Sequence, residues 1–126
     1  MTHATLEHAN ITVTNPEKSA ELLCELFDWH IRWQGDAISG GRTVHVGTDD
    51  AYLALYTHPD SAPGDGSSYE RHGGLNHIGI LVDDLNATEQ RVLDAGFKTF
   101  NHGDYEPGRR FYFNDRDGIE FEVVQY

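Results

Sequence analysis

The chain has 126 residues, of which 38% are hydrophobic and 24% are charged, so it fits one globular domain with a real core and excludes a second full-sized domain. Nine Lys and Arg against 21 Asp and Glu give a net charge of −12, which repels phosphate backbones and anionic lipid, so we expect no nucleic-acid and no membrane partner. The single cysteine excludes an intrachain disulfide, and neither a signal-peptide pattern nor an apolar run long enough for a bilayer is present. We expect a soluble, cytoplasmic protein.

The first predicted strand begins at a histidine. In LEHANITVTNPE, His8 stands ahead of a β-branched run, and Asn15 can cap the helix that follows. Apolar residues then recur at helical spacing, and three further strands are expected in WHIRWQ, TVHVGT and AYLALYT. The first module, residues 5–57, therefore reads as one strand, one helix and three strands.

A loop is expected between the two halves of the chain. Residues 58–73 are rich in Gly, Ser, Pro and Asp and contain no periodic pattern. Two interpretations stay open, because long loops are either functional or simple connections: a plain linker, or a mobile flap over a site.

The second half repeats the first when His77 is laid on His8. Asp83 or Asp84 can cap a second helix that Gly96 ends, and KTFNH, RRFYFND and IEFEVVQY supply three more strands. This second module covers residues 74–126. One βαβββ unit cannot bury both faces of its sheet, so the sequence predicts an α+β fold in which two modules form an open, curved, mixed β-barrel, a single domain over residues 1–126.

Alternation along the strands predicts which way the histidines point. The aliphatic residues of each His-led strand must cover the helices, so His8 and His77 face the opposite, concave side. Glu120 and Glu122 of the last strand face that side too. Each histidine could instead only hydrogen-bond at a strand end, but the repeat and the matching acid favour a ligand role. Two neutral imidazoles and one carboxylate suit Fe(II), Mn(II), Zn(II), Ni(II) or Co(II) and leave coordination positions open.

These features resemble the vicinal oxygen chelate superfamily, which includes glyoxalase I, fosfomycin-resistance proteins, bleomycin-binding proteins and extradiol dioxygenases. The likeness covers nearly the whole chain. The segment FYFNDRDGIEFEVVQY is similar to the family pattern Asp-Pro-Asp-Gly-Asn-x-x-Glu, with Arg116 in place of the proline and Ile119 in place of the asparagine. The family spacing selects Glu122 over Glu120.

The resemblance implies paired modules around a divalent metal held by His8, His77 and Glu122, and it implies frequent homodimers with sites within or between chains. In four-ligand members the first module adds a carboxylate, and the corresponding position here is Ala54. The three-ligand set therefore looks like that of fosfomycin-resistance proteins and extradiol dioxygenases.

Further residues are candidates for contact with a substrate. EPGRRFYF resembles a stretch of the fosfomycin-resistance proteins, and its arginines could hold an anionic group. Extradiol cleavage usually needs an additional His and Tyr. The candidates are His45 and Tyr56 for acid/base chemistry, and Tyr52, Arg110 and Tyr112 for substrate binding.

Two functions follow from this pattern. The first is a metal-dependent enzyme of dioxygenase, lyase/isomerase or resistance-transferase type that chelates neighbouring oxygens of a small substrate. The second is a metal-free small-molecule or antibiotic-binding protein, resembling the bleomycin-binding branch, in which Trp29, Trp33, Tyr52 and Tyr56 hold an aromatic or cationic ligand. We expect the enzyme, because a pure binding protein has no use for an intact triad.

Overall fold

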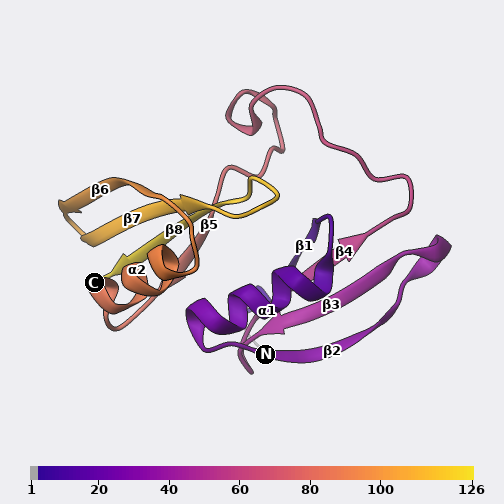
Figure 1. Ribbon diagram of the computed structural model, residues 1–126, viewed down its shortest axis with the longest axis horizontal. Helices are drawn as coiled ribbons and strands as arrows, with labels where there is room; N and C mark the ends of the chain where they lie inside the picture. The colour runs from indigo at the N-terminus through magenta and orange to yellow at the C-terminus, as the bar shows by residue number, and fades with distance from the viewer. Residues whose placement is uncertain (1–2) are drawn as a thin grey trace. The chain divides into compact units, whose positions relative to one another are not determined.

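The computed structural model describes residues 3–126 and divides them into two compact units, one ending at Ala62 and the other running from Pro63 to Tyr126. Each unit contains one helix and one four-stranded sheet (Figure 1). No helix among residues 3–126 is long and apolar enough to cross a membrane.

The first unit has the predicted order of one strand, one helix and three strands. Its strand order is β1-β4-β3-β2, with β1 parallel to β4 and the other neighbours antiparallel. Its elements are β1 (His8–Thr12), α1 (Pro16–Phe27), β2 (His30–Asp36), the 3-10 turn η1 (Ile38–Gly40), β3 (Arg42–Gly47) and β4 (Tyr52–Thr57).

The predicted cap begins α1. The side chain of Asn15 accepts a hydrogen bond from the backbone N–H of Lys18 at 3.1 Å, and Pro16 occupies the start of the helix. The helix packs on β2, β3 and β4. Its fully buried Ala20 and Leu26 join Val44, Val46 and Leu55 of the sheet to form the core of this unit.

The second unit repeats this organisation with the order β5-β8-β7-β6, again with one parallel pair, β5 and β8. Its elements are the 3-10 turn η2 (Ser68–Glu70), β5 (Ile78–Leu81), α2 (Leu85–Asp94), β6 (Thr99–Tyr105), β7 (Gly108–Asn114) and β8 (Glu120–Gln125).

The second helix confirms one of the two proposed caps. Asp84 accepts a hydrogen bond from the N–H of Ala87 at 3.0 Å, and Gly96, with φ of 94°, follows the C-cap residue Ala95. The core under this helix is aromatic: Phe111 and Phe113 are fully buried and pack with Phe121.

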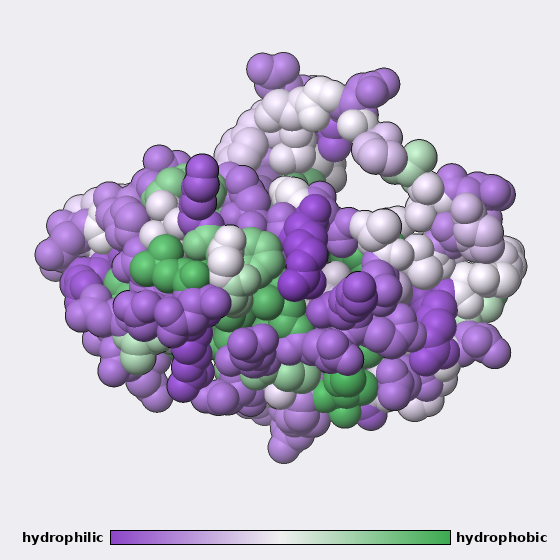
Figure 2. All heavy atoms as spheres, in the orientation of Figure 1, coloured by the Kyte–Doolittle hydropathy of each residue, from purple (hydrophilic) through white to green (hydrophobic). Residues whose placement is uncertain are grey.

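The two βαβββ modules therefore make an α+β fold, as predicted. Among residues 3–126 the strands hydrogen-bond as two mixed four-stranded sheets, one in each unit. Strand β6 continues to Tyr105, beyond the predicted KTFNH, because its far end pairs with β7 as a hairpin. Hydrophilic side chains cover most of the face seen in Figure 2.

Candidate functional site

A row of four rings crosses the face of the first sheet that points away from α1, with one ring from each strand. Trp33 lies 5.2 Å from His45, His45 lies 4.6 Å from Tyr52, and Tyr52 lies 4.9 Å from His8, all measured between ring centroids. Their positions follow from strand alternation, because the neighbouring Val44 and Val46 face the core. His8, His45 and Tyr52 therefore lie on one face of the first sheet.

A β-bulge adds a positive charge to this row. The β2–β3 register shifts between Ile31 and Trp33, so Arg32 is an extra residue without an opposite partner. Its guanidinium carbon lies 4.4 Å from the centre of the Tyr52 ring, and Nη1 donates to the carbonyl of Thr48 at 3.0 Å. The bulge therefore directs Arg32 over the ring row.

His8 is held by the residue before it. Its Nδ1 lies 2.9 Å from Oε1 of Glu7, and the Tyr52 hydroxyl donates to the same oxygen at 3.4 Å. The hydrogen bond to His8 is the main reason that the pKa of Glu7 is lowered from its usual value. Glu7 is therefore an ionised acceptor at neutral pH.

The two residues predicted for acid/base chemistry lie in different surroundings. Burial, with the nearby charges of His8 and Arg32, lowers the pKa of His45, so its imidazole is neutral at neutral pH. Tyr56 packs on the backbone: a Cβ on Gly41 would lie 2.7 Å from its ring. Only His45 belongs to the ring row.

In the second unit, one tyrosine contacts both predicted ligands. The rings of His77 and Tyr112 meet edge to face with centroids 5.7 Å apart, and the Tyr112 hydroxyl donates to Oε2 of Glu122. That hydrogen bond is the main cause that raises the pKa of Tyr112 to about 12. Tyr112 therefore keeps its proton at neutral pH and links His77 to Glu122.

Arg110 is a buried cation beside this cluster. Only 11% of its side chain is exposed, Nη1 lies 3.5 Å from Oε2 of Glu122, and Nη2 donates to the carbonyl of Gly108 at 3.2 Å. Its guanidinium carbon lies 4.5 Å from the centre of the Tyr105 ring. Nε is buried and has no hydrogen-bond partner among the described residues.

Two other arginines, one in each unit, contact a residue of the neighbouring helix. Arg42 pairs with Glu17 of α1, and Arg109 donates to Asn86 of α2 at 2.8 Å. Both guanidinium groups therefore fasten a sheet to its helix.

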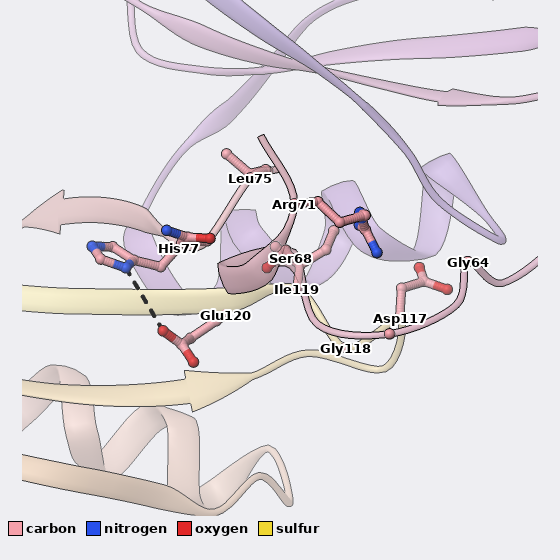
Figure 3. A pocket seen from close by; sticks show the side chains of 11 residues that line it. Gly64, Ser68, Arg71, Leu75, His77, Asp117, Gly118, Ile119 and Glu120 are labelled. Atoms are coloured by element: carbon pink, nitrogen blue, oxygen red, sulfur yellow. Dashed lines mark ion pairs between the residues drawn. The ribbon is translucent and has the colours of Figure 1, made fainter. Parts of the chain in front are cut away.

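Glu120 is the nearest carboxylate to the Nδ1 atom of His77, at 3.7 Å (Figure 3). The hydroxyl of Tyr69 donates to Oε2 of Glu120 at 2.5 Å and lies 3.4 Å from Nδ1 of His77. His77 and Glu120 line a cavity of about 320 Å³, which Arg71 and Asp117 also border.

Tyr69 comes from η2, inside the segment 58–73 that connects the predicted modules. This part of the segment therefore packs against His77 and Glu120 of the second unit. The sequence offered no signal for Tyr69, since its ring reaches the site from a loop. Glu120 shared a strand face with Glu122 and was recognisable as a neighbour of the site.

The predicted metal ligands are distributed over both units: His8 is in the first, and His77 and Glu122 are in the second. Within residues 3–126, no three His, Cys, Asp or Glu side chains form a ready-made cluster around one point. The contacts described above therefore form one cluster in each unit.

The model of the Glyoxalase/Bleomycin resistance protein/Dioxygenase superfamily matches residues 5–123. The chain belongs to this superfamily. Members of the superfamily with solved structures share its fold over nearly the whole length. A domain of this superfamily from Frankia sp. EAN1pec has 20% identity and a TM-score of 0.82, with 98% of each chain covered.

Two further members illustrate different functions on this fold. The fosfomycin resistance protein FosX from Mesorhizobium loti is 24% identical with a TM-score of 0.74, covering 98% of this chain and 92% of FosX. TnmS3, an antibiotic binding protein from Streptomyces sp. CB03234, is 20% identical with a TM-score of 0.72, covering 99% of this chain and 98% of TnmS3. No curated protein matches the chain. At these identities the superfamily members show a common fold, and function has to be argued from the site.

Proposed function

We propose that this superfamily member is a metal-dependent enzyme in which His8, His77 and Glu122 hold one divalent ion and leave positions open for two neighbouring oxygens of a small substrate. The observation that carries the proposal is the joint contact of His77 and Glu122 with Tyr112, which gathers an imidazole and a carboxylate on one sheet face. His8 stands at the corresponding strand of the first unit.

The donor set fits a divalent ion. Imidazole nitrogen and carboxylate oxygen suit Fe, Mn, Zn, Ni or Co. The side chains of His8 and His77 are 42% and 36% exposed, so both are accessible, whereas that of Glu122 is only 16% exposed and is oriented by its hydrogen bonds. A ligating carboxylate is normally held by such outer hydrogen bonds.

The ion, when bound, would supply Lewis acidity to the chelated oxygens. Around it, the Tyr112 hydroxyl would hold Glu122 in place by a hydrogen bond, because the hydroxyl stays protonated at neutral pH. Arg110 would offer a positive charge to an anionic group of the substrate, and the neutral His45 would accept a proton. Tyr52 would present its ring, already stacked with His45, to the substrate.

The proposed ion would join the two units. Because His8 lies in the first unit and His77 in the second, one metal would draw on both, either from one chain or from two chains of a homodimer. A mutant of FosX from Listeria monocytogenes, 19% identical with a TM-score of 0.72 and covering 98% of this chain and 93% of its own, has a structure with Mn(II) and a dihydroxypropylphosphonic acid. Mn(II) is therefore the first ion to test.

Elemental analysis of protein purified without chelator tests the proposal. We expect about one Fe, Mn, Zn, Ni or Co per chain in the wild type and its loss in Glu122→Ala. The exposed Glu70→Ala is the control, since it removes the same charge from the surface of the same unit. Wild-type protein that takes up none of these ions, even on reconstitution, would contradict the proposal.

The ring row favours a second candidate, a metal-free protein that binds a flat ligand. Trp33 is 52% exposed, so an aromatic ring can stack on it beside Arg32. Calorimetry of chelator-treated protein with a series of planar aromatic compounds tests this candidate. Binding that is lost in Trp33→Ala and unchanged by added metal would support it, and no binding of any compound would count against it.

A further inference from the structure

In the second unit, a tyrosine, a glutamate and a histidine form a chain of contacts. The Tyr69 hydroxyl donates to Oε2 of Glu120 at 2.5 Å, and the same oxygen faces Nδ1 of His77 at 3.7 Å. The side chain of Glu120 is only 20% exposed. Figure 3 shows His77 and Glu120 side by side on neighbouring strands.

The first unit contains the same three residue types in the same order of contact. The Tyr52 hydroxyl donates to Oε1 of Glu7 at 3.4 Å, and Nδ1 of His8 lies 2.9 Å from that oxygen. In both units the tyrosine hydroxyl and Nδ1 of the histidine therefore face the same carboxylate oxygen.

The two arrangements come from positions that do not correspond in the repeat. Strand β4 places Tyr52 opposite His8. Strand β8 pairs with β5 in the same way, but there the residue beside His77 is Glu120, one step before the pair of Ile78 and Phe121. If the two arrangements were left over from the repeat, their residues would occupy corresponding positions, and they do not. The common Tyr, Glu and His contacts therefore require another explanation.

The contacts determine which nitrogen of each neutral ring carries the proton. A carboxylate only accepts, so Nδ1 of His8 must donate to Glu7. Tyr69 gives its own proton to Glu120, so its oxygen, 3.4 Å from Nδ1 of His77, can only accept there. Both rings then carry hydrogen on Nδ1 and a lone pair on Nε2.

We propose that Glu7 and Glu120 are positioning residues for His8 and His77, which they keep as Nδ1–H tautomers with Nε2 directed to a metal. Glu7 accepts from His8 directly, with Tyr52 donating to the same oxygen. Glu120 takes the proton of Tyr69, so that the Tyr69 oxygen is left to accept from Nδ1 of His77. The inference rests on the proposed metal function and deepens it. In this arrangement Glu120 does not bind the metal but lies behind His77, where a carboxylate raises the basicity of the ligating nitrogen. Glu122 remains the proposed ligand.

Long-range ¹H–¹⁵N NMR of metal-free protein labelled in histidine tests the tautomers without any metal. At mildly alkaline pH, where imidazoles are neutral, we expect His77 and His8 to show a protonated Nδ1. In Glu120→Ala, His77 should move toward the Nε2–H form that predominates in water while His8 is unchanged. Glu120→Gln keeps an acceptor oxygen and should rescue the Nδ1–H form, and Glu70→Ala should leave both rings as in the wild type.

Titration with Mn²⁺ tests the effect on the metal. We expect Glu120→Ala and Tyr69→Phe to bind one Mn²⁺ per chain with a weakened affinity, about 10 to 100-fold for Glu120→Ala. Glu122→Ala should lose stoichiometric binding, and Glu70→Ala should match the wild type. If Glu120→Ala lost the ion and Glu122→Ala retained it, Glu120 would be the ligand and the inference would be overturned.

The two experiments separate this inference from the proposed function. Wild-type protein that binds no Mn²⁺, Fe²⁺, Zn²⁺, Ni²⁺ or Co²⁺ would overturn the metal function, and the tautomers would still be measured in the same sample. A His77 ring that has the ordinary mixture of tautomers in the wild type would overturn the positioning role, whatever the metal result.

Discussion

At the scale of single residues, one hydrogen bond determines the pKa of Tyr112. Its hydroxyl donates to Glu122, and this bond raises the pKa from 10.0 to about 12. A phenol that is protonated more tightly in the folded state contributes stability that is complete below pH 10.0 and is lost as the pH rises toward 12.

Tyr112→Phe should therefore lower the free energy of unfolding at neutral pH by about 1 to 3 kcal/mol, since a hydrogen bond to a charged group is lost. The fall in stability of the wild type between pH 10 and 12 should be smaller in the variant. Urea unfolding at a series of alkaline pH values measures both effects. Tyr126→Phe is the control because that side chain is 73% exposed, and equal alkaline slopes in wild type and Tyr112→Phe would contradict the assignment.

Glu89 gives the opposite pH dependence. Burial would raise the pKa of Glu89, but hydrogen bonds with His102, at 2.6 Å, and Thr99, at 2.5 Å, outweigh it and lower the pKa below 4.5. A carboxyl group with a lowered pKa stabilises the fold above its unfolded value, and that contribution is lost as the pH falls through the folded value.

Glu89→Gln should accordingly be less stable than the wild type at neutral pH by about 1 to 3 kcal/mol, and the difference should shrink as the pH falls below about 4.5. Denaturant unfolding from neutral to acidic pH checks this. The exposed Glu25→Gln on α1 serves as control. A stability difference that stays constant with pH would show that Glu89 is held by packing rather than by its charge.

At the scale of elements, the β3–β4 hairpin determines where Tyr52 stands in the ring row. A Cβ on Gly47 would lie 2.3 Å from the carbonyl oxygen of Ala51 and 2.6 Å from Cα of Tyr52, so the two strands approach too closely for any side chain there. Gly47 is therefore a packing requirement of the site.

Gly47→Ala should destabilise the protein by about 1 to 3 kcal/mol, because the clash falls on backbone atoms that cannot rotate away. Thermal unfolding measures the loss. Gly64→Ala is the matched control, because a Cβ at Gly64 meets nothing within 4 Å. Equal melting temperatures for the two variants would mean that the hairpin can open without cost.

Strand alternation and helix caps predicted most of the elements, but bulges lie outside such a pattern. Asn15 and Asp84 were recognisable because a cap is a local signal. The adjacent positions of Arg32 and Trp33 were not, because the β2 bulge brings two consecutive residues to the ring row, whereas simple alternation sends only one of them there. The β6 register also shifts between Phe100 and Gly103, where His102 meets Glu89, and nothing in the local sequence marks that shift.

At the scale of the whole molecule, the proposed site draws on both units, and ligand linkage can test this. A ligand that binds only the folded protein raises its stability by about 2.7 kcal/mol at a concentration of 100 times Kd. Excess Mn²⁺ should therefore raise the melting temperature of the wild type. His8→Ala and His77→Ala should each abolish the rise, while His72→Ala, an exposed position, should keep it. A full rise in His8→Ala would place the ion in the second unit alone.

The fold of the whole molecule could be predicted because the repeat of His8 at His77 revealed two modules. The site could be predicted only in part. Resemblance selected Glu122, whereas Tyr69 contacts His77 from a segment whose conformation depends on packing rather than on any periodic pattern. Long-range placement of loop side chains is determined by tertiary contacts, which a single sequence does not contain.

The exposed end of the ring row also gives the protein an intrinsic optical probe. Trp33 lies 5.2 Å from His45, while the second tryptophan, Trp29, packs on Phe27. Protonated imidazole quenches indole fluorescence, so emission from Trp33 should report the charge of His45 and any molecule that stacks there. Comparison with Trp33→Phe isolates the emission of Trp33. Binding of a molecule to the ring row can therefore be followed by tryptophan fluorescence before any substrate is known.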